Sequence, residues 1–290
     1  MASKIDVFLV GAQKAGTTSI YEWLGQHPDI CAPPAMKDYH FFTNEDINGK
    51  GVSHLDQFYK TNKDVSVHAA VNYLYFYEKS SRRIYEYNPK AKIIICLREP
   101  VARAVSAYMY CVKTLRENKS LTDALDAELN GGLSTFKQLA DNTYIGHGKY
   151  VEQIRAFRAL FTDDQIKIVL FEDIMNSERR EASMRNILQF IGLREYFYFD
   201  FTHRNNSGSP RSSILNFMLR KSVFKKVVKP ILPMTLRKRI YGALNELNTS
   251  RQKIDVDVKR EDIEFLKAHL GRIGGDLYKE HGIDVSDSWV

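Results

Sequence analysis

The chain has 290 residues, of which 44% are hydrophobic and 27% charged; this composition excludes disordered, collagen-like and disulfide-scaffold proteins. At this length the chain can bury a large core, and no apolar run reaches the roughly 18 residues that a membrane-spanning helix needs. Cys31, Cys96 and Cys111 have no C-x-x-C spacing and the N-terminus has no cleavable signal pattern, so we expect reduced thiols and a cytoplasmic protein.

The net charge of +7 comes from one segment, between Phe201 and Asn245, which contains ten basic residues and no acidic residue. A local basic segment favours one anionic partner over general coating of nucleic acid. The ten basic residues are Arg204, Arg211, Arg220, Lys221, Lys225, Lys226, Lys229, Arg237, Lys238 and Arg239.

Hydrophobic periodicity predicts strands that alternate with helices along the chain. We expect strands at residues 4–10, 65–70, 92–97 and 166–171, and helices at 17–26, 80–87, 100–115, 121–130, 150–161 and 178–191. Strands that are nearly continuous apolar runs indicate an α/β fold with a mostly parallel central sheet and helices on both faces. We predict a single domain over residues 1–290, with a basic helical C-terminal portion from about residue 204.

In such sheets ligands bind outside the carboxyl ends of the strands, which directs attention to residues 11–18. The turn there reads GAQKAGTT, and its backbone N–H groups precede a helix N-terminus that favours a phosphate. An ordinary glycine-containing turn is the alternative. The nucleoside-triphosphatase loop requires lysine directly after its second glycine. Here Thr17 follows Gly16 and the lysine is Lys14, which argues against an ATP or GTP enzyme.

This loop resembles the P-loop-like 5′-phosphosulfate-binding loop, G-x-x-K-[AGS]-G-T-[TS], of sulfotransferases that use 3′-phosphoadenosine 5′-phosphosulfate (PAPS). A second block, KIIICLREPVARAVSAY, resembles the 3′-phosphate site of that family, with Arg98 at a strand end and Ser106 eight residues later. For Arg98 alone, a surface ion pair with Glu99 or another acidic residue is the alternative. The resemblance covers most of the chain and is to the heparan-sulfate-type and bacterial carbohydrate branch.

The resemblance implies that PAPS is the donor and that no metal is required. Lys14 would neutralise the negative charge that develops on the leaving phosphate. Enzymes that transfer phosphoryl groups use cationic side chains in the same way. Residues 205–211 resemble a loop that covers the nucleotide, which makes Arg211 a weaker candidate contact; a solvated loop arginine is the alternative. The implied donor-binding residues are Gly11, Lys14, Ala15, Gly16, Thr17, Thr18, Arg98, Ser106 and Arg211.

The block MKDYHFF resembles K-E-x-H-F-F, whose glutamate is the general base of this branch. The matching residue is Asp38, whose side chain is one methylene shorter, and His40 is expected to bind or orient the acceptor. Further along, relatives carry E-K where this chain has His68 and Ala69. His68 is therefore a second candidate base, and a histidine paired with backbone at a strand end is the alternative. These acceptor-site residues differ from those of the relatives, which implies an acceptor different from the glucosamine units of heparan sulfate.

We therefore predict a sulfotransferase that moves sulfate from PAPS to a hydroxyl of a saccharide or glycolipid. The alternatives are the same chemistry on an aryl, polyketide, peptide or amine acceptor, a P-loop kinase, and a non-catalytic nucleotide-binding module. The basic segment could contact an anionic membrane surface, an anionic polysaccharide or the nucleotide. The alternative is a pair of helices packed on the core with a solvated basic face. No nucleic-acid partner is expected, because the segment contains no recognisable binding module.

Overall fold

The computed structural model describes residues 4–60, 62–193, 197–202 and 258–289, and the backbone at 209–210 and 249–250. Arg211, the rest of the 205–211 loop apart from that backbone, and nearly all of the basic segment lie outside the described residues. The described strands are β1 (Val7–Gly11), β2 (Ile30–Cys31), β3 (Val65–Ala69), β4 (Lys92–Leu97), β5 (Ile166–Leu170), β6 (Ser209–Pro210) and β7 (Thr249–Ser250).

Helices make up most of the remaining described structure. The α-helices are α1 (Thr17–Leu24), α2 (Glu45–Asn48), α3 (Val52–Asp56), α4 (Tyr77–Tyr87), α5 (Pro100–Lys113), α6 (Leu121–Leu129), α7 (Phe136–Asn142), α8 (Tyr150–Arg158), α9 (Phe171–Met175), α10 (Arg180–Ile191), α14 (Arg260–Leu270) and α15 (Ile273–His281). The short 3₁₀ turns are η1 (Pro34–Met36), η2 (Gln57–Tyr59), η3 (Gly146–Gly148) and η4 (Asp163–Gln165).

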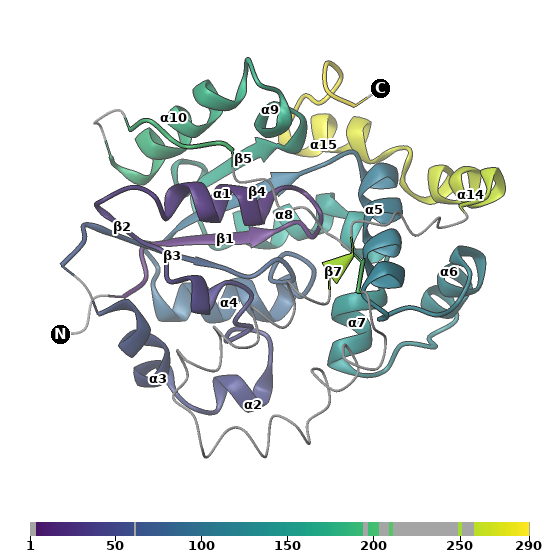
Figure 1. Cartoon of the computed structure of the whole chain (residues 1–290), viewed down its shortest axis with the longest axis horizontal. Helices are drawn as coiled ribbons and strands as arrows, with labels where there is room; N and C mark the ends of the chain where they lie inside the picture. The colour runs from purple at the N-terminus through teal and green to yellow at the C-terminus, as the bar shows by residue number, and fades with distance from the viewer. Residues whose placement is uncertain are drawn as a thin grey trace.

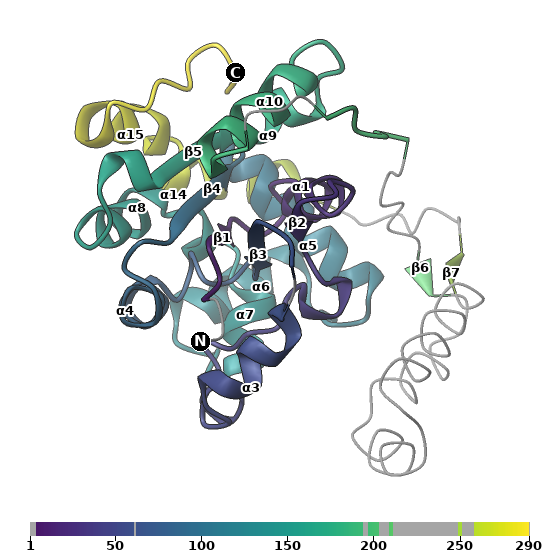
Figure 2. The same ribbon diagram turned by 90° about the vertical axis from the view of Figure 1, so that its left-hand side faces the viewer.

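The main sheet has five parallel strands in the order β2–β3–β1–β4–β5. Helices α4 and α8 cover one face, and α1 and α10 cover the other (Figures 1 and 2). The sheet is therefore buried on both sides, and β1 and β4 consist almost entirely of buried residues. β6 and β7 form a separate antiparallel pair. None of the helices formed by the described residues combines the length and apolar composition needed to cross a bilayer.

The predicted α/β fold with a parallel sheet and helices on both faces is confirmed. The strand expected at 92–97 has these bounds in the structure, while the strand expected at 4–10 begins at Val7 and ends at Gly11. Phe171, expected to end a strand, instead begins α9. The sequence did not indicate β2, α7 or α9, because each is too short to show a clear period.

Strand order determines where a site can form. β1 lies between β3 and β4. After β1 the chain forms β2 and β3 on one side of it and then crosses to β4 on the other side. The carboxyl ends of these three strands are therefore adjacent at the point where the connections diverge, which is where open α/β sheets bind ligands. Helix α5 begins directly after β4 at this edge, and Glu99 caps it by accepting from Val101 N (2.9 Å) and Ala102 N (2.5 Å).

Candidate active site

The loop between β1 and α1 is held against β4. Ala12 N donates to Cys96 O at 2.6 Å, and the Cys96 thiol donates to Ala15 O at 2.6 Å. These bonds fix the loop that the sequence identified as a phosphate site. Thr17 and Thr18 begin α1, so the loop leads into a helix N-terminus whose first N–H groups lack intrahelical partners.

Both glycines of the loop are required by its geometry. At Gly11 φ is +156°, and a Cβ there would lie 2.6 Å from the Cβ of Leu74. Gly16 has φ of +80°, and a Cβ would lie 3.2 Å from the Phe171 ring. A side chain at either position would be strained, so the loop depends on glycine for both its turn and its close packing.

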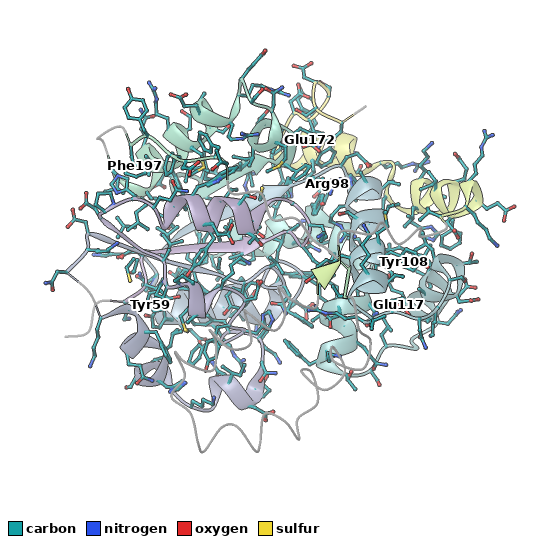
Figure 3. All side chains as sticks on the ribbon, in the orientation of Figure 1. Tyr59, Arg98, Tyr108, Glu117, Glu172 and Phe197 are labelled. Carbon is teal, nitrogen blue, oxygen red and sulfur yellow. The ribbon has the colours of Figure 1, made fainter. Side chains whose placement is uncertain are left out.

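Lys14, Arg98 and Ser106 line one pocket of about 520 Å³, which we call the cationic pocket. It lies along α5 and includes Ile263 of α14 in its lining. Arg98 lies beside the start of α5 (Figure 3). The residues lining it are Lys14, Arg98, Glu99, Val101, Ala102, Val105, Ser106, Met109, Tyr110, Lys113 and Ile263. The three residues that the sequence assigned to two separate motifs thus share one cavity.

Arg98 is oriented by two contacts. Its Nη1 donates to Lys14 O at 3.2 Å, and its Cζ lies 4.4 Å from the centroid of the Phe171 ring. The Glu99 carboxylate, the alternative partner, is engaged in capping α5. The guanidinium is therefore joined to the phosphate loop and leaves donor groups for a ligand in the pocket.

The pocket is suited to an anion. Burial is the largest influence that lowers the pKa of Lys14, and the neighbouring Arg98 lowers it further. Cys111 opposes them, and Lys113 and Arg116 add smaller effects that lower the pKa. Cations that repel one another at short range are stabilised when a multiply charged anion binds between them. A ligand with two or more phosphate groups therefore fits these residues.

Sequence reasoning missed Tyr110 and Lys113, which line the cationic pocket. Both lie on α5, four and seven residues after Ser106, and this spacing places them on the same helical face. The helical spacing from Ser106 could have identified both residues, because side chains four and seven positions further along a helix lie on the same face.

Asp38 lies on the loop that follows η1, at the carboxyl end of β3. Its N donates to Ala69 O (2.8 Å), and its Oδ1 accepts from Val71 N (3.1 Å) and Lys37 Nζ (2.8 Å). Partial burial acts to raise the pKa of Asp38, but Lys37 and Val71 N–H hold it below its ordinary value of 3.8. Its side chain remains 42% exposed, so Asp38 is an ionised, accessible carboxylate at neutral pH.

His40 lies two residues further on, beside the Phe136 ring of α7, at a centroid distance of 5.9 Å. Burial lowers its pKa below 6.5, although the Asp38 carboxylate acts to raise it, so the ring is neutral at pH 7. Among the described residues, neither His40 Nδ1 nor the buried Asn72 amide has a partner in hydrogen-bond geometry. A neutral imidazole with a free nitrogen can orient a hydroxyl group.

Lys14 and Asp38 have the same unusual backbone conformation. Their φ angles are 64° and 58°, and Leu115 is the one other non-glycine residue with positive φ in the part of the chain that the structure describes. A left-handed conformation costs a residue with a Cβ about 1–2 kcal/mol. Such strain concentrates at functional sites, where surrounding contacts maintain it. At Asp38 these contacts are the hydrogen bonds to β3 and Val71.

His68 lies in the core, and this contradicts the expectation that it is a second base. It has no exposed surface, and its Nδ1 and Nε2 lie 2.7 and 2.9 Å from the hydroxyls of Tyr59 and Tyr73. Burial lowers its pKa to about 3. Both ring nitrogens are occupied and no acceptor can reach them, so His68 is a structural residue that bridges two tyrosines.

We expect the free energy of unfolding to depend less on pH in His68→Gln than in the wild type. Between pH 6.5 and about 3 the unfolded chain binds a proton at His68 that the folded chain does not, so stability falls as pH falls through this window. From pH 7.5 to 5.0 this linkage costs the wild type roughly 2 kcal/mol. Glutamine does not titrate and can still pair with both hydroxyls. The measurement is the free energy of unfolding in urea at the two pH values.

The His68→Gln variant is expected to be less stable than wild type at pH 7.5 but to lose less on acidification. His269→Gln, at an exposed histidine of α14, is the matched control and should behave as wild type. Equal losses in His68→Gln and wild type would show that His68 is not the group responsible.

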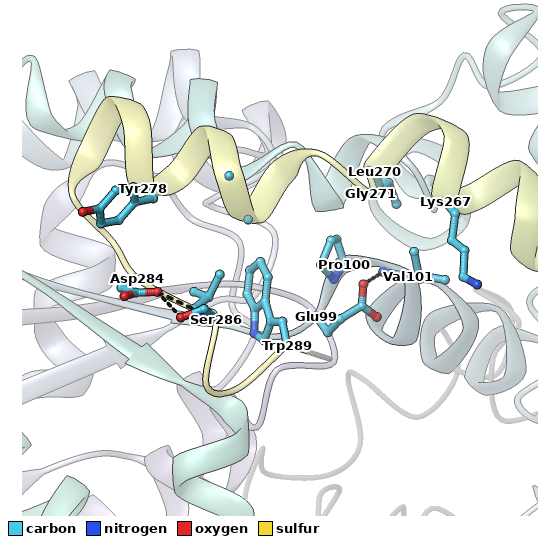
Figure 4. A pocket seen from close by; sticks show the side chains of 13 residues that line it. Glu99, Pro100, Val101, Lys267, Leu270, Gly271, Tyr278, Asp284, Ser286 and Trp289 are labelled. Atoms are coloured by element: carbon cyan, nitrogen blue, oxygen red, sulfur yellow. Dashed lines mark hydrogen bonds between the residues drawn. The ribbon is translucent and has the colours of Figure 1, made fainter.

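A second pocket of about 800 Å³ lies between the start of α5 and helices α14 and α15 (Figure 4). Trp289 forms one wall, and its Nε1 donates to Glu172 Oε2 at 3.3 Å. The two pockets share Glu99 and Val101, but none of the sequence-predicted site residues that the structure describes lines the second one. We therefore assign the anion site to the smaller, cationic pocket.

Comparison with known proteins agrees with the geometry. The family model described as "Sulfotransferase domain" matches residues 4–234. Heparan sulfate glucosamine 3-O-sulfotransferase 6 of Mus musculus is 25% identical over 216 residues, 70% of this chain and 60% of that protein. The bifunctional heparan sulfate N-deacetylase/N-sulfotransferase 1 of Mus musculus is 26% identical over 197 residues, 64% of this chain and 22% of that protein.

A further relative and a solved structure support the same assignment. Heparan sulfate glucosamine 3-O-sulfotransferase 5 of Homo sapiens is 30% identical over 115 residues, 39% of this chain and 32% of that protein. The chain thus spans less than two thirds of the length of each of the three relatives. The crystal structure of a sulfotransferase from Alicyclobacillus acidocaldarius is 27% identical with a TM-score of 0.61, covering 81% of this chain and 99% of that one. The matched domain includes the loop, Arg98 and Ser106, and the chain belongs to the sulfotransferase family.

Proposed function

We propose that the protein uses PAPS as its donor and transfers the sulfuryl group to a hydroxyl of a saccharide. The observation that carries the proposal is the cationic pocket, in which Lys14, Arg98 and Ser106 come together. The resemblance assigns these residues to the 5′-phosphosulfate and the 3′-phosphate of PAPS. The names of the three relatives, all heparan sulfate sulfotransferases, support a saccharide acceptor.

In this proposal the residues of the cationic pocket bind and orient the donor. The planar guanidinium of Arg98 suits the terminal 3′-phosphate, and the Ser106 hydroxyl adds one hydrogen bond. The N–H groups of the 11–18 loop and the start of α1 bind the 5′-phosphate. Lys14 lies on this loop and stabilises the negative charge that develops on the leaving phosphate.

The donor supplies the sulfuryl group, and the side chains on the β3 side prepare the acceptor. The acceptor oxygen forms a bond to sulfur while the bond between sulfur and the phosphate oxygen breaks. Asp38, ionised and accessible, takes the proton of the acceptor hydroxyl, and neutral His40 orients that hydroxyl. No step requires His68, which is buried.

The length of the Asp38 side chain bears on which acceptor the site takes. Asp38 is one methylene shorter than the glutamate of K-E-x-H-F-F, so the acceptor oxygen must approach the loop more closely. This favours, as a second candidate, the same transfer to a smaller aryl or polyketide hydroxyl. Contact of the basic segment with an anionic membrane, and hence a glycolipid acceptor, is a further proposal that rests on the sequence alone.

The proposal is tested first by thermal unfolding with 3′,5′-adenosine bisphosphate, AMP or Mg²⁺-ATP. At 100 times its dissociation constant, a ligand of the folded state adds about 2.7 kcal/mol, which raises the Tm of a chain of this size by roughly 5 °C. We expect this rise with the bisphosphate alone. A rise with Mg²⁺-ATP alone would indicate a kinase, and no rise with any of them would refute the donor site. Mass spectrometry of PAPS reactions with saccharide, aryl and polyketide alcohols then identifies the acceptor class.

Arg98→Ala should remove most of the Tm rise produced by the bisphosphate, because the charge-assisted pair with the 3′-phosphate is lost. Arg98→Lys should restore it only in part, since an ammonium group cannot form the two parallel hydrogen bonds of a guanidinium. The matched control is Arg82→Ala, at an exposed arginine of α4. If Arg98→Ala bound the bisphosphate as tightly as Arg82→Ala, the assignment of the 3′-phosphate to Arg98 would be wrong.

A further inference from the structure

One aromatic side chain in the cationic pocket contacts Lys14. The Nζ of Lys14 lies 4.2 Å from the centroid of the Tyr110 ring. The Cζ of Arg116 lies 5.4 Å from the same centroid, and Arg116 Nη1 is paired with Asp141 Oδ1 at 2.8 Å. The ring thus contacts two cations, one of which is tied to α7 by an ion pair.

The position of Tyr110 follows from the helix that carries it. Tyr110 lies four residues after Ser106 on α5, and residues at this spacing are neighbours on one face of a helix. The ring and the Ser106 hydroxyl therefore line the same pocket.

The surroundings of Lys14 disfavour its charged form, so the contact with the Tyr110 ring affects its pKa. Burial is the largest influence that lowers its pKa, and Arg98, Lys113 and Arg116 act in the same direction, with Cys111 opposing them. An aromatic face is negative and attracts a cation, more strongly the further the pair is removed from water. The Tyr110 ring therefore offsets part of the repulsion that Lys14 experiences from the neighbouring cations.

We infer that Tyr110 is a positioning residue for Lys14: the face of its ring holds the ammonium group at the wall of the cationic pocket. The inference depends on the proposed function only for the catalytic role of Lys14. The contact, and its effect on the charge of Lys14, do not depend on which donor or acceptor is used.

The experiment is an NMR titration of protein labelled with [¹³Cε]lysine, in which the Lys14 signal is assigned by its loss in Lys14→Arg. Tyr110→Leu keeps an apolar side chain of similar bulk but removes the negative face of the ring. We expect the pKa of Lys14 to fall by roughly 0.5–1 in Tyr110→Leu. Tyr110→Phe keeps the ring and should rescue most of this change. Tyr110→Met replaces the leucine variant if the latter is poorly folded.

Tyr85→Leu, the same change at an exposed tyrosine of α4, is the matched control and should leave the Lys14 titration at its wild-type value. The inference is overturned if Tyr110→Leu titrates like wild type, or if Tyr110→Phe loses as much as Tyr110→Leu, because the hydroxyl would then be responsible. Once an acceptor is known, Tyr110→Leu should lower kcat more than it raises the KM for PAPS.

The result is separable from the test of the proposed function. If the bisphosphate fails to raise the Tm of the wild type, the proposed function fails, while the titration still decides the role of Tyr110. If the bisphosphate binds and Lys14 titrates identically in Tyr110→Leu and wild type, this inference alone fails.

Discussion

Replacing Lys14 by alanine is expected to lower the rate of sulfuryl transfer by about 10²- to 10³-fold, the typical cost of removing one preorganised charge-stabilising group. The fold should be retained, because Lys14 contributes its backbone carbonyl to Arg98 and its ammonium to the cationic pocket, and neither is part of the core. Alanine also has a Cβ, so the positive φ at this position costs the same in both proteins. The measurement is kcat with PAPS and the identified acceptor, together with the Tm.

Lys113→Ala is the informative comparison, since it removes another lysine from the same pocket. Lys113 lies on α5 and not on the phosphate loop, so its loss should weaken bisphosphate binding more than it lowers kcat. Lys50→Ala, at an exposed lysine after α2, should have no effect on either quantity. A Lys14→Ala enzyme that retained the wild-type kcat would remove Lys14 from the mechanism.

Asp38→Asn is expected to lower kcat by about 10²- to 10⁴-fold, the usual contribution of a positioned general base, with little change in bisphosphate affinity. Asparagine has the same size and can still accept from Val71 N, so the loop should keep its conformation. Because Lys37 and Val71 hold the pKa of Asp38 below 3.8, activity that depends on this carboxylate is present above pH 4 and is lost only below it. An acid limb between pH 4 and 6.5 would instead report His40, whose pKa lies below 6.5.

Two variants make the Asp38 result decisive. Asp38→Glu restores the carboxylate with the longer arm of K-E-x-H-F-F, so it should retain part of the activity that Asp38→Asn loses. His68→Gln should keep kcat, because His68 is enclosed by Tyr59 and Tyr73. If Asp38→Asn were fully active and His68→Gln were folded but inactive, the roles assigned to the two residues would have to be exchanged.

Local features of this chain could be predicted because their causes are local. The short apolar run KIIICL predicts a buried strand, and β4 has the predicted bounds. Pro100 at the first helical position predicted the start of α5, which Glu99 then caps. The phosphate loop could be predicted for the same reason, because the spacing of two glycines and a lysine determines both the turn and the charge of the loop.

Features that depend on neighbours distant in sequence could not be predicted. His40 and His68 are both histidines in blocks that resemble the acceptor side of the family, yet His40 is half-buried with a free nitrogen and His68 is enclosed. Burial depends on the packing of β3 against Tyr59 and Tyr73, and a single sequence does not contain that information. The contact of Lys14 with Tyr110 likewise joins residues 96 positions apart, through the arrangement of β1, β4 and α5.

The sequence by itself determined that this chain forms a parallel α/β sheet with an anion-binding loop after its first strand. It did so because apolar periodicity and turn chemistry act over a few residues. Only the tertiary structure decided that Tyr110 and Lys113 line the same cavity as Lys14, Arg98 and Ser106, and that His68 belongs to the core. These outcomes depend on strand order and side-chain packing. Both bring together residues that are far apart in the sequence, and their contacts cannot be predicted from the sequence positions.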